Sequence, residues 1–191
     1  MTTHTTVLRR RLGALLFAVL FLTAMPGASS EIRIPEKPRP DEPPRGVVLT
    51  GESALHAAQG FCSEEGTTIL WQPGPEEVAR LEKSFPAFMA GLKTPSDYQP
   101  LHEYYRQYLG IIRGGKKTIC VNLFHYSFVQ RSLESPHLNP RIQKIVQEGG
   151  RAEDFWKTEP IFMSDGGAYY FTVQFDAETG TFLWVAFNGN A

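Results

Sequence analysis

The sequence lacks the short motifs that mark common classes of enzyme. It contains no GxSxG around a nucleophilic serine, no P-loop and no GxGxxG dinucleotide fingerprint. Its five histidines are His4, His56, His102, His125 and His137, and no two of them have the HxH or HExxH spacing of a metal-binding helix. The sequence therefore predicts no cofactor and no metal, and motifs assign no catalytic residue.

An excess of positive charge is also absent. The chain has 19 Lys and Arg against 20 Asp and Glu, and Arg9, Arg10 and Arg11 lie in an N-terminal leader. Without those three arginines, 16 basic residues face 20 acidic ones, a net charge of −4. A surface that binds nucleic acid is strongly basic. Nucleic acid is therefore excluded as the expected partner.

Long apolar runs are missing except at the N-terminus. The basic residues 9–11 precede an apolar run of 14 residues at 12–25, and small residues follow at 27–30, as in a secretory signal peptide. Crossing a bilayer takes about 20 apolar residues, so no stable membrane span is expected after cleavage near residue 30. The alternative is an uncleaved anchor. A lipoprotein would carry a cysteine at the cleavage site, and none lies there, so a lipid anchor is not expected. We expect a periplasmic or secreted protein.

Cysteine is scarce, with Cys62 and Cys120 as the two in the chain. An even count in an exported protein indicates a disulfide. A bridge that closes such a long loop stabilises a fold by about 4 kcal/mol in the loop-entropy model. The alternatives are two buried free thiols, or a thiolate nucleophile with His125 near Cys120, although no Cys–His family signature surrounds either cysteine.

The remaining chain divides into two parts. Residues 31–45 hold five prolines and mixed charges. Such a composition favours a flexible, extended segment, with a spacer or a ligand for a proline-reading partner as sharper alternatives. Residues 46–191 are long enough for a single domain with its own core.

The clearest helix of that domain begins at Gly74 and Pro75. Apolar residues recur at helical spacing through the segment that follows: Val78, Leu81, Phe85, Phe88, Met89 and Leu92. Pro86 lies inside this pattern and predicts a kink or a split near Ser84. Shorter helices are expected over 54–59 and from Asn139, and short strands over 46–49, 67–71 and 160–163.

Two β-hairpins complete the pattern. In the first, Gly114-Gly115 is a two-residue turn between strands at 104–113 and 116–124, which pairs Ile111 with Thr118.

The second hairpin turns at residues 176–180. Pairing Phe175 with Phe182 places Val173 opposite Trp184 and Phe171 opposite Ala186, which gathers aromatic pairs on one face. Trp184 is then predicted to be a core residue.

The C-terminal half, from about Tyr105, carries the segments YLGIIRGGKKTICVNLF, DGGAYYFTVQFD and TFLWVAFNGNA. In these segments it resembles a group of small secreted bacterial proteins without an assigned function. The resemblance implies export and a small α+β domain, and it transfers no catalytic residue.

A helix followed by successive hairpins predicts the α+β class, with one main helix packed on a largely antiparallel sheet. A cystatin-like arrangement fits this order, although a shared fold does not fix function. We expect an exported binding or inhibitor-type module whose partner is an envelope or extracellular protein. The alternatives are a small secreted hydrolase and an envelope structural component. Asp165, His102 and Glu103 are the candidate binding or hydrolytic residues.

Overall fold

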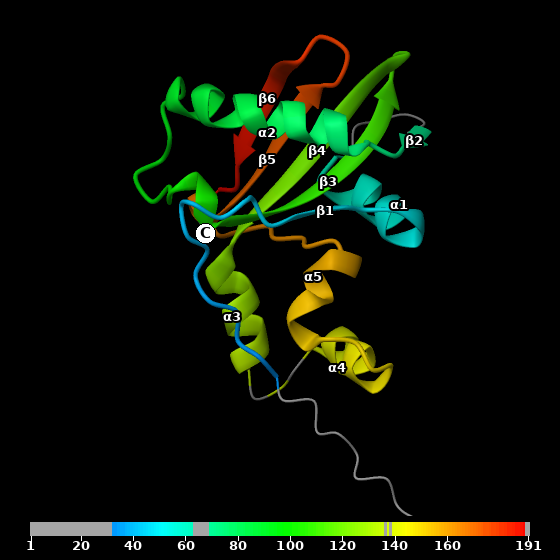
Figure 1. Cartoon of the computed structure of the whole chain (residues 1–191), viewed down its shortest axis with the longest axis vertical. Helices are drawn as coiled ribbons and strands as arrows, with labels where there is room; N and C mark the ends of the chain where they lie inside the picture. The colour runs from blue at the N-terminus through cyan, green and yellow to red at the C-terminus, as the bar shows by residue number, and fades with distance from the viewer. Residues whose placement is uncertain (1–31, 63–68, 136, 138, 190–191) are drawn as a thin grey trace, which may run out of the picture.

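The computed structural model describes residues 32–62, 69–135, 137 and 139–189 (Figure 1). The signal peptide expected over residues 1–30 lies outside these residues. Within them, no helix is both long and apolar enough to cross a bilayer.

The described strands form one six-stranded sheet in the order β1-β3-β4-β5-β6, and β2 pairs with β3 beyond the end of β1. The strands are β1 Gly46–Val48, β2 Ile69–Trp71, β3 Tyr104–Arg113, β4 Lys116–His125, β5 Tyr170–Asp176 and β6 Thr181–Phe187. β1 runs parallel to β3, and β3 to β6 form an antiparallel meander.

Helices cover both faces of this sheet. The α-helices are α1 Gly51–Gly60, α2 Pro75–Ala90, α3 Tyr126–Glu134, α4 Pro140–Gln147 and α5 Phe155–Thr158. Three 3₁₀ turns join them, η1 Leu101–Glu103, η2 Ala152–Asp154 and η3 Gly167–Tyr169. α2 crosses one face, and α3, α4 and α5 lie at the other side and end of the sheet (Figure 1). The predicted α+β class, with one main helix on a largely antiparallel sheet, is confirmed.

α2 forms where its apolar stripe was predicted. The side chain of Glu77 accepts a hydrogen bond of 2.8 Å from the Gly74 amide at the start of the helix, where an anion suits the helix dipole. Phe85 and Met89 are buried against the sheet on either side of Pro86. The helix runs through Pro86 without a split, so the alternative of two helices separated near Ser84 is wrong. Packing of the flanking turns outweighs the missing proline hydrogen bond.

The β3–β4 hairpin has the predicted turn and register. Gly114 and Gly115 have φ of 54° and 79°, values that other residues adopt at a cost. Ile111 pairs with Thr118 as expected.

The β5–β6 hairpin begins in the predicted register and then departs from it. Phe175 pairs with Phe182, but the next pair is Gln174 with Trp184, so Leu183 is an extra residue in β6. Such a bulge moves every later side chain of the strand to the opposite face. Val185 now faces the core under α2, and Trp184 is 46% exposed. The prediction of Trp184 as a core residue is therefore wrong.

The segment between β4 and β5 differs most from expectation. α3 had not been expected, and residues 160–163 form no strand. The backbone of Ile161 instead bonds to side chains of the sheet. Its amide donates to Gln107 Oε1 at 2.9 Å, and its carbonyl accepts from Asn122 Nδ2 at 2.7 Å. Sheet-like hydrogen bonding is thus supplied by side chains rather than by a neighbouring strand.

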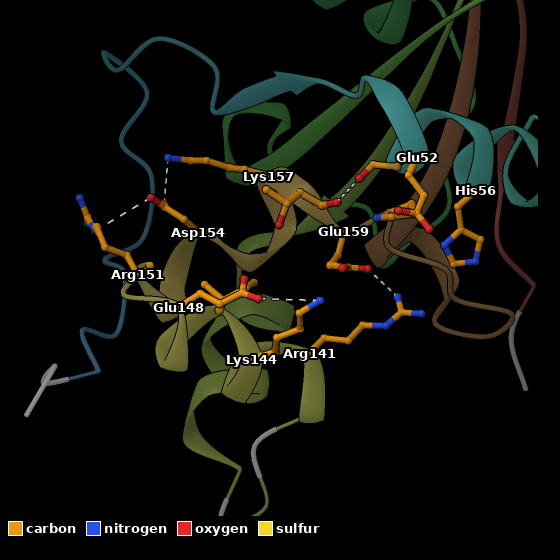
Figure 2. Close-up of a pocket in the computed structure, with 14 residues that line it drawn as sticks. Glu52, His56, Arg141, Lys144, Glu148, Arg151, Asp154, Lys157 and Glu159 are labelled. Atoms are coloured by element: carbon orange, nitrogen blue, oxygen red, sulfur yellow. Dashed lines mark hydrogen bonds and ion pairs between the residues drawn. The ribbon is translucent and has the colours of Figure 1, made fainter.

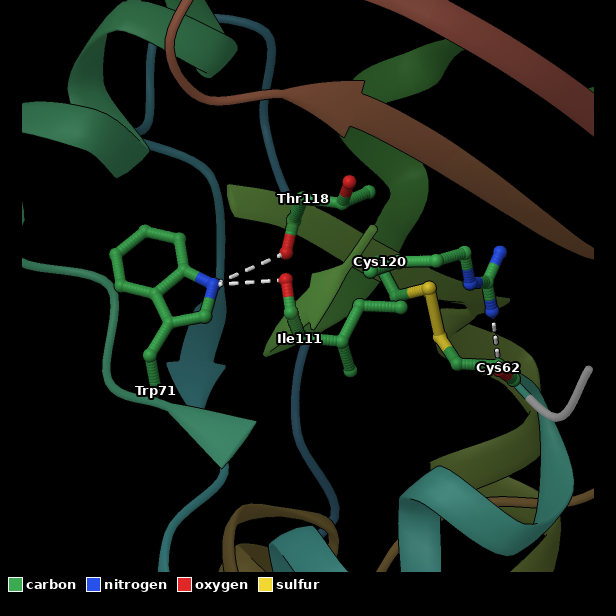
Figure 3. Close-up of a disulfide and its surroundings, with 6 residues drawn as sticks. Cys62, Trp71, Ile111, Thr118 and Cys120 are labelled. Atoms are coloured by element: carbon green, nitrogen blue, oxygen red, sulfur yellow. Dashed lines mark hydrogen bonds between the residues drawn. A yellow bond between two sulfur atoms is a disulfide. The ribbon is translucent and has the colours of Figure 1, made fainter. Parts of the chain in front are cut away.

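Cys62 and Cys120 form the predicted disulfide (Figure 3), with their Cα atoms 6.3 Å apart. The bridge ties the end of α1 to the middle of β4 and lies in a small buried cluster. Nearby, the Trp71 indole N–H donates to the carbonyls of Ile111 and Thr118 at 3.1 and 3.3 Å, which holds β2 against the hairpin (Figure 3). A buried disulfide is consistent with an oxidising, exported location.

Residues 32–45, part of the segment expected to be a flexible spacer, lie along the domain from beside α3 to the start of β1 (Figure 1). We call these residues the strap. The Pro35 carbonyl accepts a 3.0 Å hydrogen bond from Gln130 of α3. At the other end, Arg45 donates to the Tyr105 hydroxyl at 2.7 Å. The strap is therefore attached to the sheet and to α3.

Candidate functional site

Glu103, one of the residues singled out in the sequence, lies at the centre of a polar cluster. Its Oε2 atom is 3.1 Å from His125 Nε2 and its Oε1 atom is 2.8 Å from Lys37 Nζ of the strap. His102, another candidate residue, has its Nε2 atom 3.9 Å from Oε1. Tyr104 pairs with His125 at the end of the β3–β4 hairpin, and this pairing brings Glu103, just before β3, close to His125 at the end of β4.

The second ring nitrogen of His125 is also occupied. Nδ1 lies 2.8 Å from the Ser127 hydroxyl and accepts a longer hydrogen bond, 3.4 Å, from the Ser127 amide. His125 is thereby the N-cap of α3. We call Lys37, His102, Glu103, His125 and Ser127 the Glu103 cluster.

Burial and charge set the protonation of this cluster. Burial lowers the pKa of His125, and the carboxylate of Glu103 only partly opposes that effect. Burial alone would raise the pKa of Glu103, but hydrogen bonds from Lys37 and His125 outweigh it and hold that pKa below its usual value. At neutral pH the cluster therefore contains a neutral imidazole between a carboxylate and a hydroxyl.

A carboxylate, an imidazole and a hydroxyl in series are the residue types of a serine hydrolase. Here Glu103 and His125 are only 4% and 6% exposed. Of the whole cluster, only His102 lines one of the three cavities described below. What the arrangement does is cap α3 and bind the strap to the sheet, so we assign it a structural role.

We expect acid to weaken this attachment. A histidine in an unfolded chain titrates near pH 6.5, whereas the folded state resists protonation of His125 because its pKa is lowered. The unfolded state then binds more protons, and stability decreases as the pH falls below about 6.5. Glu103, also with a lowered pKa, loses its contribution further down, as the pH falls below 4.5. Urea unfolding at a series of pH values measures both.

The matched variant is His125→Asn, because asparagine caps a helix but does not titrate. The loss of stability between pH 7.5 and 5.5 should be smaller in this variant than in the wild type. Parallel pH profiles would contradict the assignment.

Asp165 lies apart from the Glu103 cluster. It is exposed in the turn before η3 and makes no ion pair with the cluster. It also lines none of the three cavities described below. Its neighbour Gly166 has φ of 140°, a backbone conformation typical of glycine in turns.

A cleft of about 890 Å³ lies between α1, α4 and the end of α5 (Figure 2). Its charged side chains pair with one another, with 2.7 Å between Arg141 and Glu159 and 2.8 Å between Lys157 and Asp154. The one histidine of its lining, His56, packs its ring against Phe162 at 5.0 Å. The described charged residues of the lining balance in sign, and the hydroxyl of Ser53, one turn before His56 on α1, donates to the Thr158 carbonyl.

A second hollow follows α2 on the side of the strap. Two cavities of about 570 and 510 Å³ are both lined by Pro44 and Glu82 and therefore adjoin each other. One wall is α2, and the other is formed by the strap and β1. We call the two cavities together the α2 groove. Its apolar lining residues are Pro40, Pro44, Val48, Pro73, Pro75, Val78, Ala79, Pro86, Met89, Ala90, Leu92, Tyr98 and Leu101.

Polar groups occur at the middle of the groove, where Glu82 of α2 meets β3. Arg106 Nε lies 3.0 Å from Glu82 Oε1, and the Tyr108 hydroxyl donates to the same oxygen at 2.7 Å. Burial, followed by the charge of Glu82, raises the pKa of Tyr108, so its hydroxyl stays protonated. The Arg106 side chain is 2% exposed, and its Nε–H is not aligned for a hydrogen bond.

Sequence reasoning missed Glu82, Arg106 and Tyr108. A signal was present, because Tyr104, Arg106 and Tyr108 alternate along one strand and so share a face. A charged residue on a face that is otherwise aromatic indicates a buried ion pair. His102 is the one sequence candidate that the structure places on the groove.

Among the described residues, no group of three or more His, Cys, Asp or Glu side chains is placed to hold a metal ion. In comparisons with known proteins, the chain matches no protein-family model, no curated protein and no solved structure.

Proposed function

We propose that this protein is an exported binding module that holds an elongated, largely apolar ligand in the α2 groove. The observation that carries the proposal is the pair of adjoining cavities, of about 570 and 510 Å³, with mostly apolar walls and the Glu82–Arg106 ion pair at the middle. Sites for small molecules in proteins have this size and composition.

The shape and charge of the groove narrow the class of ligand. The groove follows α2, and a helix of 16 residues is about 24 Å long, so an elongated molecule fits better than a compact one. Arg106 and Glu82 neutralise each other, and the other lining carboxylate, Glu42, is paired with Arg39 and Arg45 of the strap. The ligand class that suits such a lining is therefore uncharged or nearly so, with at most one polar group opposite the Glu82 carboxylate.

Binding is favoured over hydrolysis by the state of the reactive side chains. The alternative of a hydrolase that uses Asp165, Glu103 or a histidine predicts a cleft that holds two or more of these side chains. The α2 groove holds His102 alone of these, and the Glu103 carboxylate is buried and paired with Lys37 and His125. Export rests on the expected leader and on the disulfide.

The test uses N-phenyl-1-naphthylamine, an uncharged fluorescent probe whose emission rises in apolar sites. Ala79 and Ala90 are exposed and line the two cavities. Ala79→Trp and Ala90→Trp should fill the groove and weaken probe binding at least tenfold. Ala87→Trp is the matched control, because Ala87 is an exposed residue of α2 that lines neither cavity. Equal affinities in all three variants and the wild type would contradict the proposal.

A further inference from the structure

β6 is the last strand of the sheet, and its outer edge carries no protective feature in its composition. Thr181–Phe187 contains no charged residue and no proline. Natural sheets commonly guard an open edge with lysine or proline, because unpaired backbone groups are a template for another chain. At the opposite side of the sheet, β3 is covered by both β1 and β2.

Side chains at this edge are exposed to an unusual degree for their size. Leu183 is 54% and Trp184 is 46% exposed. The other face of the strand is covered, since Phe182 stacks on Phe88 of α2 with 4.2 Å between ring centroids. The exposed side chains therefore lie at the edge and on the face away from α2.

The backbone of β6 is also arranged for pairing. The Asn188 amide donates to the Tyr170 carbonyl of β5 at 3.0 Å. Residues of an antiparallel strand bond alternately to one side and to the other. The amides and carbonyls of Val185 and Phe187 consequently point away from β5, towards the open edge.

We infer that this edge is the interface with a second copy of the same chain, paired antiparallel about a two-fold axis at Val185. Val185 of each copy then exchanges two backbone hydrogen bonds with Val185 of the other. In the same register each Trp184 lies opposite Ala186 of the other copy. The largest exposed side chain of the strand thus meets the smallest, and cross-strand neighbours of this kind stabilise a sheet.

The charge of β6 permits pairing with a second copy. A strand with a charged residue near its centre repels itself when it is paired about a two-fold axis, and β6 has none. The pairing also ends at two chains, because it uses the one long open edge that each copy has in its described residues. No residue of β6 lines the α2 groove, so the inference does not depend on the proposed function.

Sedimentation equilibrium of the purified protein tests the inference. The wild type should be a dimer, and so should Val185→Thr, which keeps the outward amide. Val185→Pro should be a monomer with an unchanged circular dichroism spectrum, because the amide that it removes is not bonded to β5. Leu183→Lys, at an exposed position, should also be a monomer. This second variant keeps the test decisive if Val185→Pro does not fold. A monomeric wild type, or dimers of both disrupting variants, would overturn the inference.

Cysteine cross-linking tests the register. Val185→Cys should form a disulfide between chains on mild oxidation, because the two copies of residue 185 face each other. Thr181→Cys is the control, since residue 181 is exposed but lies opposite residue 189 of the other copy in this register. Equal cross-linking of both variants, or none of Val185→Cys, would overturn the register. A wild type that is monomeric but takes up uncharged extended peptides at β6 would show that the edge serves another partner and would likewise overturn the inference.

Discussion

Replacement of both Cys62 and Cys120 by alanine should lower the free energy of unfolding by about 4 kcal/mol. The bridge joins residues 58 positions apart, and a loop of that length loses much conformational freedom in the unfolded chain once it is closed. A domain of this kind has a total stability of only about 5–15 kcal/mol. Urea denaturation of the double variant against the oxidised wild type measures the difference.

Reduction of the wild type with a thiol is the control, because it breaks the same bond without removing any atoms from the core. The reduced wild type and the double variant should unfold at similar urea concentrations. Removal of a native disulfide from a small domain typically costs about 2–5 kcal/mol. If the free energies of unfolding of both proteins instead stay within about 1 kcal/mol of the oxidised wild type, the bridge does not stabilise the fold by closing the loop.

The bridge was predictable because its evidence is local or compositional. Two cysteines behind an expected secretory leader leave one pairing, and the same reasoning needs no knowledge of the fold. The β3–β4 hairpin was predictable for a similar reason. Gly114-Gly115 fixes the turn, and a two-residue turn fixes the register of every pair that follows it.

The β5–β6 hairpin shows where local reasoning stops. Its turn was correct, with the Asp176 carboxylate accepting from the amides of Glu178 and Thr179. Strict alternation then placed Trp184 in the core. A bulge at Leu183 could not be recognised from the sequence, because every residue of this strand but one is apolar. No alternation of polar and apolar residues therefore favours one register over the other. In the structure Trp184 is instead exposed on β6, the edge strand that we propose as the dimer interface.

The candidate site was predictable only in part. His102 and Glu103 drew attention as polar residues beside tyrosines, and the structure places His102 on the α2 groove and Glu103 in a buried cluster. The groove itself is made by α2, by β3 and by the strap with β1, three parts that are far apart in the sequence. Contacts of that range depend on how the helix lies across the sheet, and periodicity within one segment carries no information about it.

Gln107 is a second case in which contacts between distant segments, here contacts that stabilise the fold, could not be predicted from the sequence. A glutamine in a strand is commonly exposed, but this one is fully buried on the face opposite α2. Its Nε2 donates to the carbonyls of Trp156 and Glu159, both at 2.6 Å. Its Oε1 accepts from the Ile161 amide at 2.9 Å and from Asn122 Nδ2 at 3.1 Å. One side chain thus forms hydrogen bonds with three backbone groups of the segment 156–161, which pairs with no strand.

Gln107→Leu should therefore lower the free energy of unfolding by about 4 kcal/mol, since several buried polar groups lose their partner and each costs about 1–3 kcal/mol. Gln130→Leu is the matched control. Gln130 is half-buried and donates one hydrogen bond, to Pro35 of the strap, so its loss should cost about 1 kcal/mol. Urea unfolding followed by tryptophan fluorescence compares the two, and Trp156 at the end of the network reports on the segment directly. Equal destabilisation by the two substitutions would mean that residues 155–161 are held by their apolar contacts with the sheet, through Phe155, Trp156 and Ile161, rather than by the amide of Gln107.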